Sequence, residues 1–188
     1  MELHKFKKID IGFAIISSQP NVGNLLCTVR SIKNNYPTAP YLCVVPKNTP
    51  AETFKRLAEL CPIFKGKSTV TSLINVGLKK SKSDWTMILM EGTPLHKGLD
   101  RKYSLFIENE SDVLYSLVID YNKQGKPIKI RNSFDDAPIN GTLIHKNVFQ
   151  KVGIFSEDDE SIPKAKLFWS AKATQLGCKF KGILRRIL

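Results

Sequence analysis

The chain has 188 residues, of which 42% are hydrophobic and 24% charged, as is typical of one globular domain with its own core, so we expect a single domain over residues 1–188. No apolar run approaches the roughly 18 residues of a membrane-spanning helix, and the first eight residues are too polar for a secretory signal, which favours a cytoplasmic protein. The formal net charge of +12 attracts phosphate-rich partners such as nucleotides, whereas the lack of aromatic side chains interleaved along a basic strand argues against a nucleic acid.

The first part of the chain alternates strand and helix patterns. Ile9–Ile16 is an almost continuous apolar run, as expected of a strand buried on both faces, and Tyr41–Val45 is a second one. Between them, Val22–Ile32 carries apolar residues at helical spacing, and Asn21 is its predicted N-cap.

The alternation continues over the next forty or so residues. The run Thr49-Pro50-Ala51-Glu52 predicts a helix start with a capping box and proline at the first helical position. A further helix is predicted over Val70–Leu78 and a strand over Trp85–Met90. This order predicts parallel strands joined by right-handed crossovers.

Three predicted loops follow the ends of these strands, at Ser17–Asn21, Pro46–Thr49 and Glu91–Pro94. In open parallel sheets, ligands bind beyond the carboxyl ends of the strands. We therefore expect a binding site where these three loops meet.

The second half of the chain has a different pattern. A helix is predicted near residues 101–108, and Val113–Ile119 with Ile128–Ile130 predicts a hairpin around a turn at Asn122–Lys126. There follow a short strand over Gly141–Ile144, a small helix over Lys146–Val152, a final helix over Ile162–Leu176 ended by Gly177, and a closing strand over Lys179–Ile183. Together, the predicted elements form a mixed sheet with flanking helices.

The four cysteines, Cys27, Cys43, Cys61 and Cys178, show neither a Cys-x-x-Cys pair nor a histidine at zinc-ligand spacing. Cys27 and Cys43 lie within apolar patterns. We therefore interpret them as small core thiols rather than as disulfide partners or metal ligands.

Several segments occur in an order that matches one known family. They are Ile15-Ile16-Ser17-Ser18-Gln19-Pro20-Asn21, Asn75-Val76-Gly77-Leu78 ahead of Trp85–Leu89, Gly141-Thr142-Leu143-Ile144, and Val152-Gly153-Ile154-Phe155-Ser156-Glu157. Together, from Ile9 to about Gly177, they resemble the A-type nucleotide-sugar glycosyltransferases of the inverting, family-two kind.

The resemblance implies an α/β fold: a single-domain, three-layer α/β/α sandwich with a mixed, mostly parallel sheet, like the nucleotide-diphospho-sugar transferases. It implies a nucleotide-sugar partner, UDP- or GDP-linked, and transfer of the sugar to a hydroxyl acceptor. The residues at its donor-binding positions are Ser17, Ser18, Asn48, Asn75, Glu91 and Thr93.

The chain departs from the family at the metal site. The two aspartates of the family's Asp-x-Asp motif are replaced by Met90 and Gly92, and Glu91 between them is a candidate ligand for Mn²⁺ or Mg²⁺. A lone acidic loop residue is more often simply solvated, so a metal requirement is doubtful. A lysine such as Lys47 could supply the positive charge instead.

The family's catalytic base also lacks a direct counterpart, because its positions fall on Pro163 and Lys164. The acidic run upstream makes Glu157, Asp158 and Asp159 the candidate bases. The alternative is an exposed acidic loop that balances nearby lysines. At the level of the whole protein, a divergent glycosyltransferase is the favoured hypothesis, and a catalytically inactive binding or scaffold protein of the same fold is the alternative.

Overall fold

The computed structural model of the chain describes residues 9–98, 103, 106–107, 111–121, 126–157 and 161–184. Of the helix predicted near residues 101–108, Tyr103, Phe106 and Ile107 are described and are helical. Residues 122–125 of the predicted turn Asn122–Lys126, and the candidate bases Asp158 and Asp159, lie outside the described residues.

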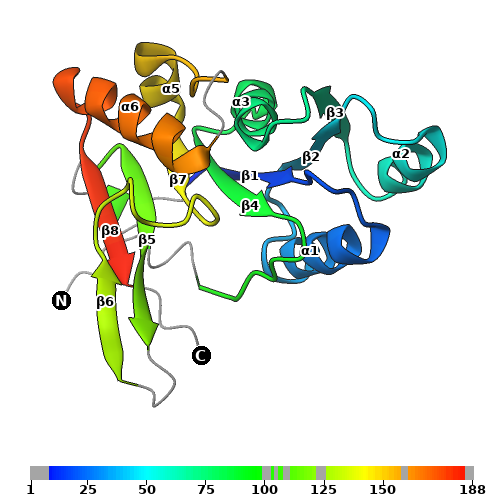
Figure 1. Cartoon of the computed structure of the whole chain (residues 1–188). Coiled ribbons are helices and arrows are strands. Elements are labelled where there is room, and N and C mark those ends of the chain that lie inside the picture. The colour runs from blue at the N-terminus through cyan, green and yellow to red at the C-terminus, as the bar shows by residue number, and fades with distance from the viewer. Residues whose placement is uncertain are drawn as a thin grey trace.

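One mixed sheet organises the fold (Figure 1). Its strands are β1 (Ile11–Ile16), β2 (Tyr41–Pro46), β3 (Ile63–Gly66), β4 (Trp85–Met90), β5 (Val113–Tyr121), β6 (Pro127–Arg131), β7 (Leu143–His145) and β8 (Phe180–Leu184). They lie in the order β3-β2-β1-β4-β7-β5-β6, and β8 pairs with β5. The pairs among β1 to β4 and the pair β5–β8 are parallel, whereas β7 is antiparallel to β4 and β5, and β6 is antiparallel to β5.

The helices form a layer on each face of this sheet. They are α1 (Val22–Asn35), α2 (Ala51–Ala58), α3 (Val70–Lys80), α5 (Lys146–Val152) and α6 (Ile162–Gln175). The helices α3, α5 and α6 cover one face, and α1 lies against the other (Figure 1). Side chains of β1 alternate between two cores, since Phe13 and Ile15 pack in the cluster of α1 and α2, and Ala14 and Ile16 in the cluster of α3, α5 and α6. The predicted three-layer sandwich is therefore confirmed.

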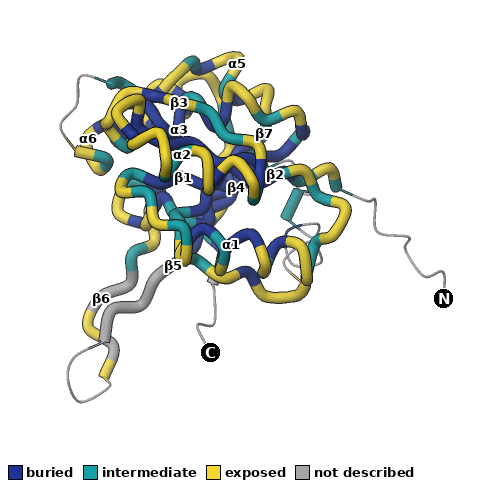
Figure 2. The backbone as a smooth tube through the Cα atoms, turned by 90° about the vertical axis from the view of Figure 1, so that its right-hand side faces the viewer, coloured by how far each residue is buried: buried dark blue, intermediate teal, exposed yellow. Residues whose placement is uncertain are grey.

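The central strands are buried over most of their length, as their apolar sequences predict, and exposed residues lie on the outer sides of the helices (Figure 2). Gly77 allows α3 to lie close to the sheet, because a Cβ at this position would be 2.9 Å from the Cβ of Ala14. The alignment of α3 on β1 and β2 in turn carries Asn75 to the carboxyl edge of the sheet.

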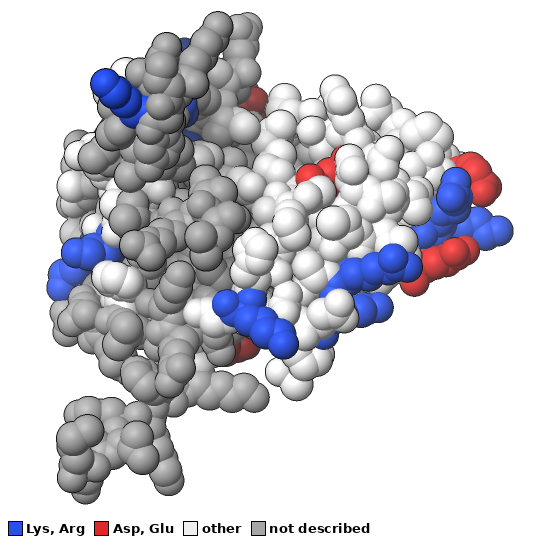
Figure 3. Space-filling model, turned by 90° about the horizontal axis from the view of Figure 1, so that it is seen from below, with Lys and Arg blue, Asp and Glu red and all other residues white. Residues whose placement is uncertain are grey.

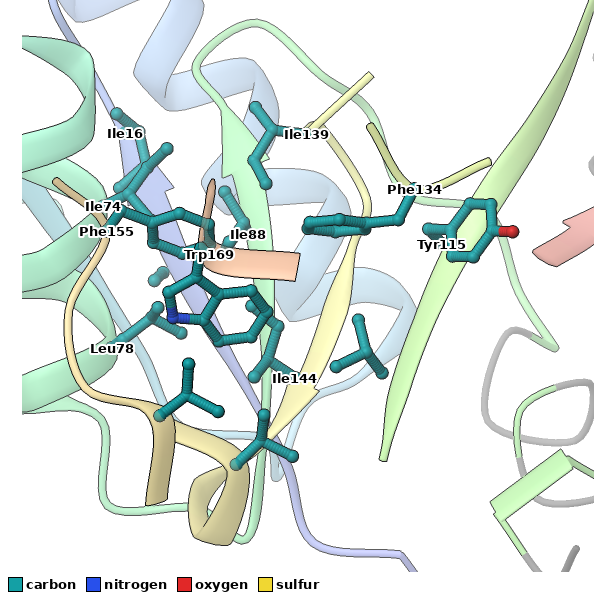
Figure 4. Close-up of a cluster of buried hydrophobic side chains, with 14 of the residues drawn as sticks. Ile16, Ile74, Leu78, Ile88, Tyr115, Phe134, Ile139, Ile144, Phe155 and Trp169 are labelled. Atoms are coloured by element: carbon teal, nitrogen blue, oxygen red, sulfur yellow. The ribbon is translucent and has the colours of Figure 1, made fainter. Parts of the chain in front are cut away.

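An aromatic cluster joins α6 to the rest of the fold (Figure 4). Trp169 stacks on Phe155 with ring centroids 4.6 Å apart, and its indole N–H donates to the Gly153 carbonyl at 2.9 Å. Phe134 packs against Trp169 and against Tyr115 of β5. This cluster fixes the segment that follows α5, which leads directly to Glu157.

Three local expectations from the sequence were wrong or incomplete. The strand β3 was not predicted, because it is a four-residue edge strand whose burial is only partial. No capping box forms at α2, because the Thr49 hydroxyl donates to the Pro46 carbonyl at 2.7 Å and Pro50 itself is the N-cap. Cys27 is exposed on α1 rather than in the core, whereas Cys43 is buried as expected.

Candidate functional site

The ends of β1 and β4 are tied together by side chains predicted from the sequence. Ser17 is fully buried, and its hydroxyl donates a hydrogen bond to Glu91 Oε2, which also accepts from the Asn21 backbone N–H at 3.3 Å. The Glu91 backbone N–H donates to the Ile16 carbonyl at 3.0 Å. The sheet register therefore brings Ser17 and Glu91 together, although 74 positions separate them in the chain.

The carboxyl group of Glu91 is half-buried. Burial raises its pKa above the ordinary value, and the hydrogen bonds from Ser17 and Asn21 offset this rise only in part. Because these two donors hold Oε2, the carboxylate serves to connect the loop after β1 with the loop after β4.

Asn140 holds the loop after β4 through two further hydrogen bonds. Its Oδ1 accepts from the Met90 backbone N–H at 3.0 Å, and its Nδ2 donates to the Thr93 hydroxyl at 3.1 Å. Gly92, at φ +83°, is in a conformation that suits glycine, and its N–H donates to the Thr28 hydroxyl at 2.9 Å. The loop from Glu91 to Thr93 is thus fixed at each residue.

A second group of candidate residues gathers beside β2 and β3. Asn48 Oδ1 accepts from the Ser68 hydroxyl at 3.3 Å, and the neighbouring Lys67 forms an ion pair with Glu157 at 2.9 Å. Ser18, at the end of β1, is half-buried, and Lys47, just after β2, is exposed. Sequence reasoning missed Lys67 and Ser68 because it missed β3, whose end positions them.

Asn75 makes a two-point contact with the backbone of Phe155. Its Nδ2 donates to the Phe155 carbonyl at 2.8 Å, and its Oδ1 accepts from the Phe155 N–H at 2.9 Å. The same Nδ2 lies 3.4 Å from Glu157 Oε1. Asn75 is only 4% exposed, so the contact that the structure gives it is with this segment, and its contact with a donor stays a prediction.

Glu157 is held in its ionised form. The hydrogen bond and charge of Lys67 are the main reason that its pKa is lowered, and hydrogen bonds from Asn75 and Ser72 add to the effect. A carboxylate of this kind is ready to accept a proton at neutral pH, but its ion pair makes it a weak base. Its predicted role as a catalytic base stays a prediction.

The described residues do not fit a divalent metal ion. Among them, no three His, Cys, Asp or Glu side chains come together. Glu91 is flanked by Met90 and Gly92, and the one oxygen that faces the β1 loop already accepts two hydrogen bonds. Mn²⁺ and Mg²⁺ require several oxygen ligands, and the described residues do not bring such a set together at Glu91.

No helix in the described part of the chain is long and apolar enough to cross a membrane. No protein-family model matches the sequence, and no curated protein matches it either.

Solved structures do resemble the fold. The structure of 4-diphosphocytidyl-2C-methyl-D-erythritol synthase from Anaerococcus prevotii superposes with a TM-score of 0.58 at 14% identity, over 94% of this chain and 87% of that one. S. aureus TarS gives a TM-score of 0.62 at 13% identity, over 93% of this chain and 35% of TarS. A CMP:2-keto-3-deoxy-manno-octonic acid synthetase in complex with CTP gives a TM-score of 0.51 at 10% identity, over 94% of this chain and 90% of the synthetase.

These identities are low, so the likeness concerns the fold alone. The chain has the α/β sandwich fold of the nucleotide-diphospho-sugar transferases, which confirms the predicted fold class. It spans about a third of the length of TarS.

Proposed function

We propose that this protein binds a nucleotide-diphosphate sugar, UDP- or GDP-linked, at the carboxyl edge of β1, β2 and β4, and transfers the sugar to a hydroxyl acceptor. The observation that carries the proposal is the convergence of the loops after β1 and β4 through Ser17 and Glu91. Ligands of open parallel sheets bind at this edge. Among proteins of the same fold, one TarS structure is a complex with UDP.

In this proposal the loops at the carboxyl edge of β1, β2 and β4 supply polar groups and positive charge to the nucleotide-sugar donor. Ser18 and Asn48 contact the nucleotide, and Lys47 offers its charge to the diphosphate. Ser17, Glu91 and Thr93 shape the loop against which the phosphates lie. Since the described residues bring no group of metal ligands together, we propose that donor binding does not depend on Mn²⁺ or Mg²⁺ and that lysine stabilises the leaving diphosphate.

The transfer step would use Glu157 as its base. The acceptor hydroxyl oxygen attacks the anomeric carbon, the bond from that carbon to the diphosphate breaks, and the hydroxyl proton passes to the Glu157 carboxylate. Asn75 acts as a positioning residue, because it holds the backbone of Phe155 two residues ahead of Glu157.

A binding protein without turnover is the second candidate function. It is favoured by the ion pair between Glu157 and Lys67, which weakens the base, and by the single carboxylate at the end of β4. The two candidates share the donor site and differ in whether nucleotide is released.

Release of nucleotide from a panel of nucleotide sugars, with candidate hydroxyl acceptors, tests the proposal. We expect acceptor-dependent release by the wild-type protein, and a fall of about 10²-fold or more in kcat for Glu157→Gln with little change in KM. Glu59→Gln, at an exposed position after α2, is the control and should match the wild type. Donor binding without release in any combination would favour the binding protein, and equal rates for Glu157→Gln would remove Glu157 from the mechanism.

A further inference from the structure

A cavity lies at the edge of the sheet opposite to the candidate site. Its volume is about 420 Å³, and it is enclosed by the end of α3, the start of β4, β7 and α5. Thr86 lies in its wall, whereas Met90, four residues further along the same strand, leads into the candidate site. Four residues of an extended strand span roughly 13 Å, so the cavity and the candidate site are separate.

The cavity combines an apolar floor with a basic rim. Leu78, Ile144, Phe149 and Ile154 give it apolar surface, of which Ile154 is 51% exposed. The rim carries Lys79, Lys82 and Lys146, and none of the described residues that line the cavity is acidic. A volume of several hundred Å³ with mixed walls is that of a small-molecule site.

Two of the three rim lysines are available to a ligand. Lys146 forms an ion pair with Asp84, which occupies its charge. Lys79 and Lys82 are exposed, and neither has an acidic partner in the described part of the chain. Lys79 lies in the last turn of α3, where a cation also favours the helix dipole, but Lys82 lies beyond the helix and has no such role.

A hydroxyl group adds a donor to the rim. The Thr86 hydroxyl donates to Ser81 Oγ at 2.7 Å, which leaves the hydrogen of Ser81 to donate elsewhere. Ser81 is half-buried and lines the cavity. Two ammonium groups and one hydroxyl match the charge and the acceptors of a dianionic phosphate.

We propose that this cavity binds a phosphate monoester with an apolar body, the phosphate at Lys79, Lys82 and Ser81 and the body against the floor formed by Ile144, Phe149 and Ile154. The phosphate could belong to a soluble alkyl or aryl phosphate or to a lipid headgroup, since both present the same chemistry.

Titration calorimetry with phenyl phosphate as the probe tests this site. Phenyl phosphate is expected to bind at least tenfold more tightly than inorganic phosphate or phenol. The double variant Lys79→Gln/Lys82→Gln should weaken it at least tenfold, while Lys55→Gln, an exposed lysine on α2, should leave it unchanged. Absence of phenyl phosphate binding, or equal weakening by the α2 control, would overturn the proposal.

A separate variant tests the apolar part of the proposed site. Ile154→Ser, at an exposed position, should bring the affinity for phenyl phosphate towards that for inorganic phosphate. An unchanged preference for phenyl phosphate would contradict the assigned floor. Thermal unfolding of each variant verifies that it is folded.

Two further measurements identify the class of the phosphate ligand and test whether the cavity binds it independently of the donor site. Co-sedimentation with phosphatidylcholine vesicles that contain phosphatidic acid, lost in the double variant, would assign a lipid headgroup, and phenyl phosphate binding without co-sedimentation would assign a soluble ligand. Phenyl phosphate affinity should not change in Lys47→Gln or with UDP present. Competition by UDP would place the probe in the candidate site and overturn the proposal.

Discussion

At the scale of single residues, Glu91 both links two strand ends and belongs to the candidate donor site. Its carboxylate joins the ends of β1 and β4, but burial makes the charged form costly and so raises its pKa. A folded-state pKa above the unfolded value means that the folded protein binds more protons, so this group contributes stability at low pH that is lost as the pH rises.

The substitution Glu91→Gln tests whether burial of the Glu91 charge costs stability. A glutamine retains an oxygen that accepts from Ser17 and Asn21 and carries no charge to desolvate. We expect the stability of the variant, relative to the wild type, to increase as the pH rises from 4.5 through the raised pKa of Glu91. Urea denaturation of both proteins at pH 4 and pH 7 measures this, and a difference that is the same at both values would contradict the burial of the charge.

Asn140 is the residue whose loss should most directly loosen the loop after β4. Asn140→Ala removes two hydrogen bonds, to Met90 and Thr93, and should cost about 1–2 kcal/mol of unfolding free energy. It should also weaken nucleotide-sugar binding, because the loop loses its fixed shape. Asn132→Ala, at an exposed position of the same segment, is the control; equal losses in both variants would show that Asn140 is not a specific clamp.

At the scale of elements, α6 secures the segment that carries Asn140. Lys166 on α6 is 2% exposed, and its ammonium group donates to the carbonyls of Asp135 and Ala137. Burial lowers the pKa of Lys166 from 10.5 to about 8, against the opposing effect of Asp135 and Asp136. The aromatic ring of Phe134 lies against the same ammonium group.

The pKa of Lys166 predicts a pH dependence of stability. A lysine whose folded-state pKa is lowered destabilises the fold fully below pH 8, and the penalty diminishes as the pH rises above 8 towards 10.5. Relative to Lys166→Met, the wild type should therefore gain stability between pH 8 and 9.5. Chemical denaturation across that range checks this, and a constant difference would show that Lys166 stays charged when folded.

The elements that sequence patterns predicted best are those whose signal is local. Asn21 caps α1 as expected, with its side chain accepting from the Asn24 N–H at 3.0 Å, and the long apolar strands β1, β2 and β4 formed as predicted. The capping box at Thr49 failed because a competing carbonyl of the preceding turn takes its hydroxyl.

The candidate site was predictable only in part, for a physical reason. Ser17 and Glu91 could be placed at one edge because parallel strands align their ends. Their direct contact, and the roles of Asn140 and Lys67, depend on side chains from segments far apart in the chain, and no periodicity encodes such pairs.

At the scale of the whole molecule, the net charge of +12 is not spread evenly over the surface. On the face seen from below, several lysine and arginine side chains lie beside acidic ones at the right, others lie at the left, and the centre of the described surface is mostly uncharged (Figure 3). The cavity at the opposite edge carries lysines, and the described part of its lining contains no acidic residue. Anionic ligands are therefore expected at defined places rather than over the whole surface.

The donor site is the central claim, and thermal unfolding with a panel of UDP- and GDP-linked sugars, with and without Mn²⁺, tests it most directly. A donor at a hundred times its Kd adds about 2.7 kcal/mol, or roughly 5–10 °C in Tm for a chain of this size. We predict such a shift for at least one nucleotide sugar, independent of Mn²⁺ and reduced in Lys47→Gln. A folded protein whose Tm is unchanged by every donor would contradict a nucleotide-sugar site at this edge of the sheet.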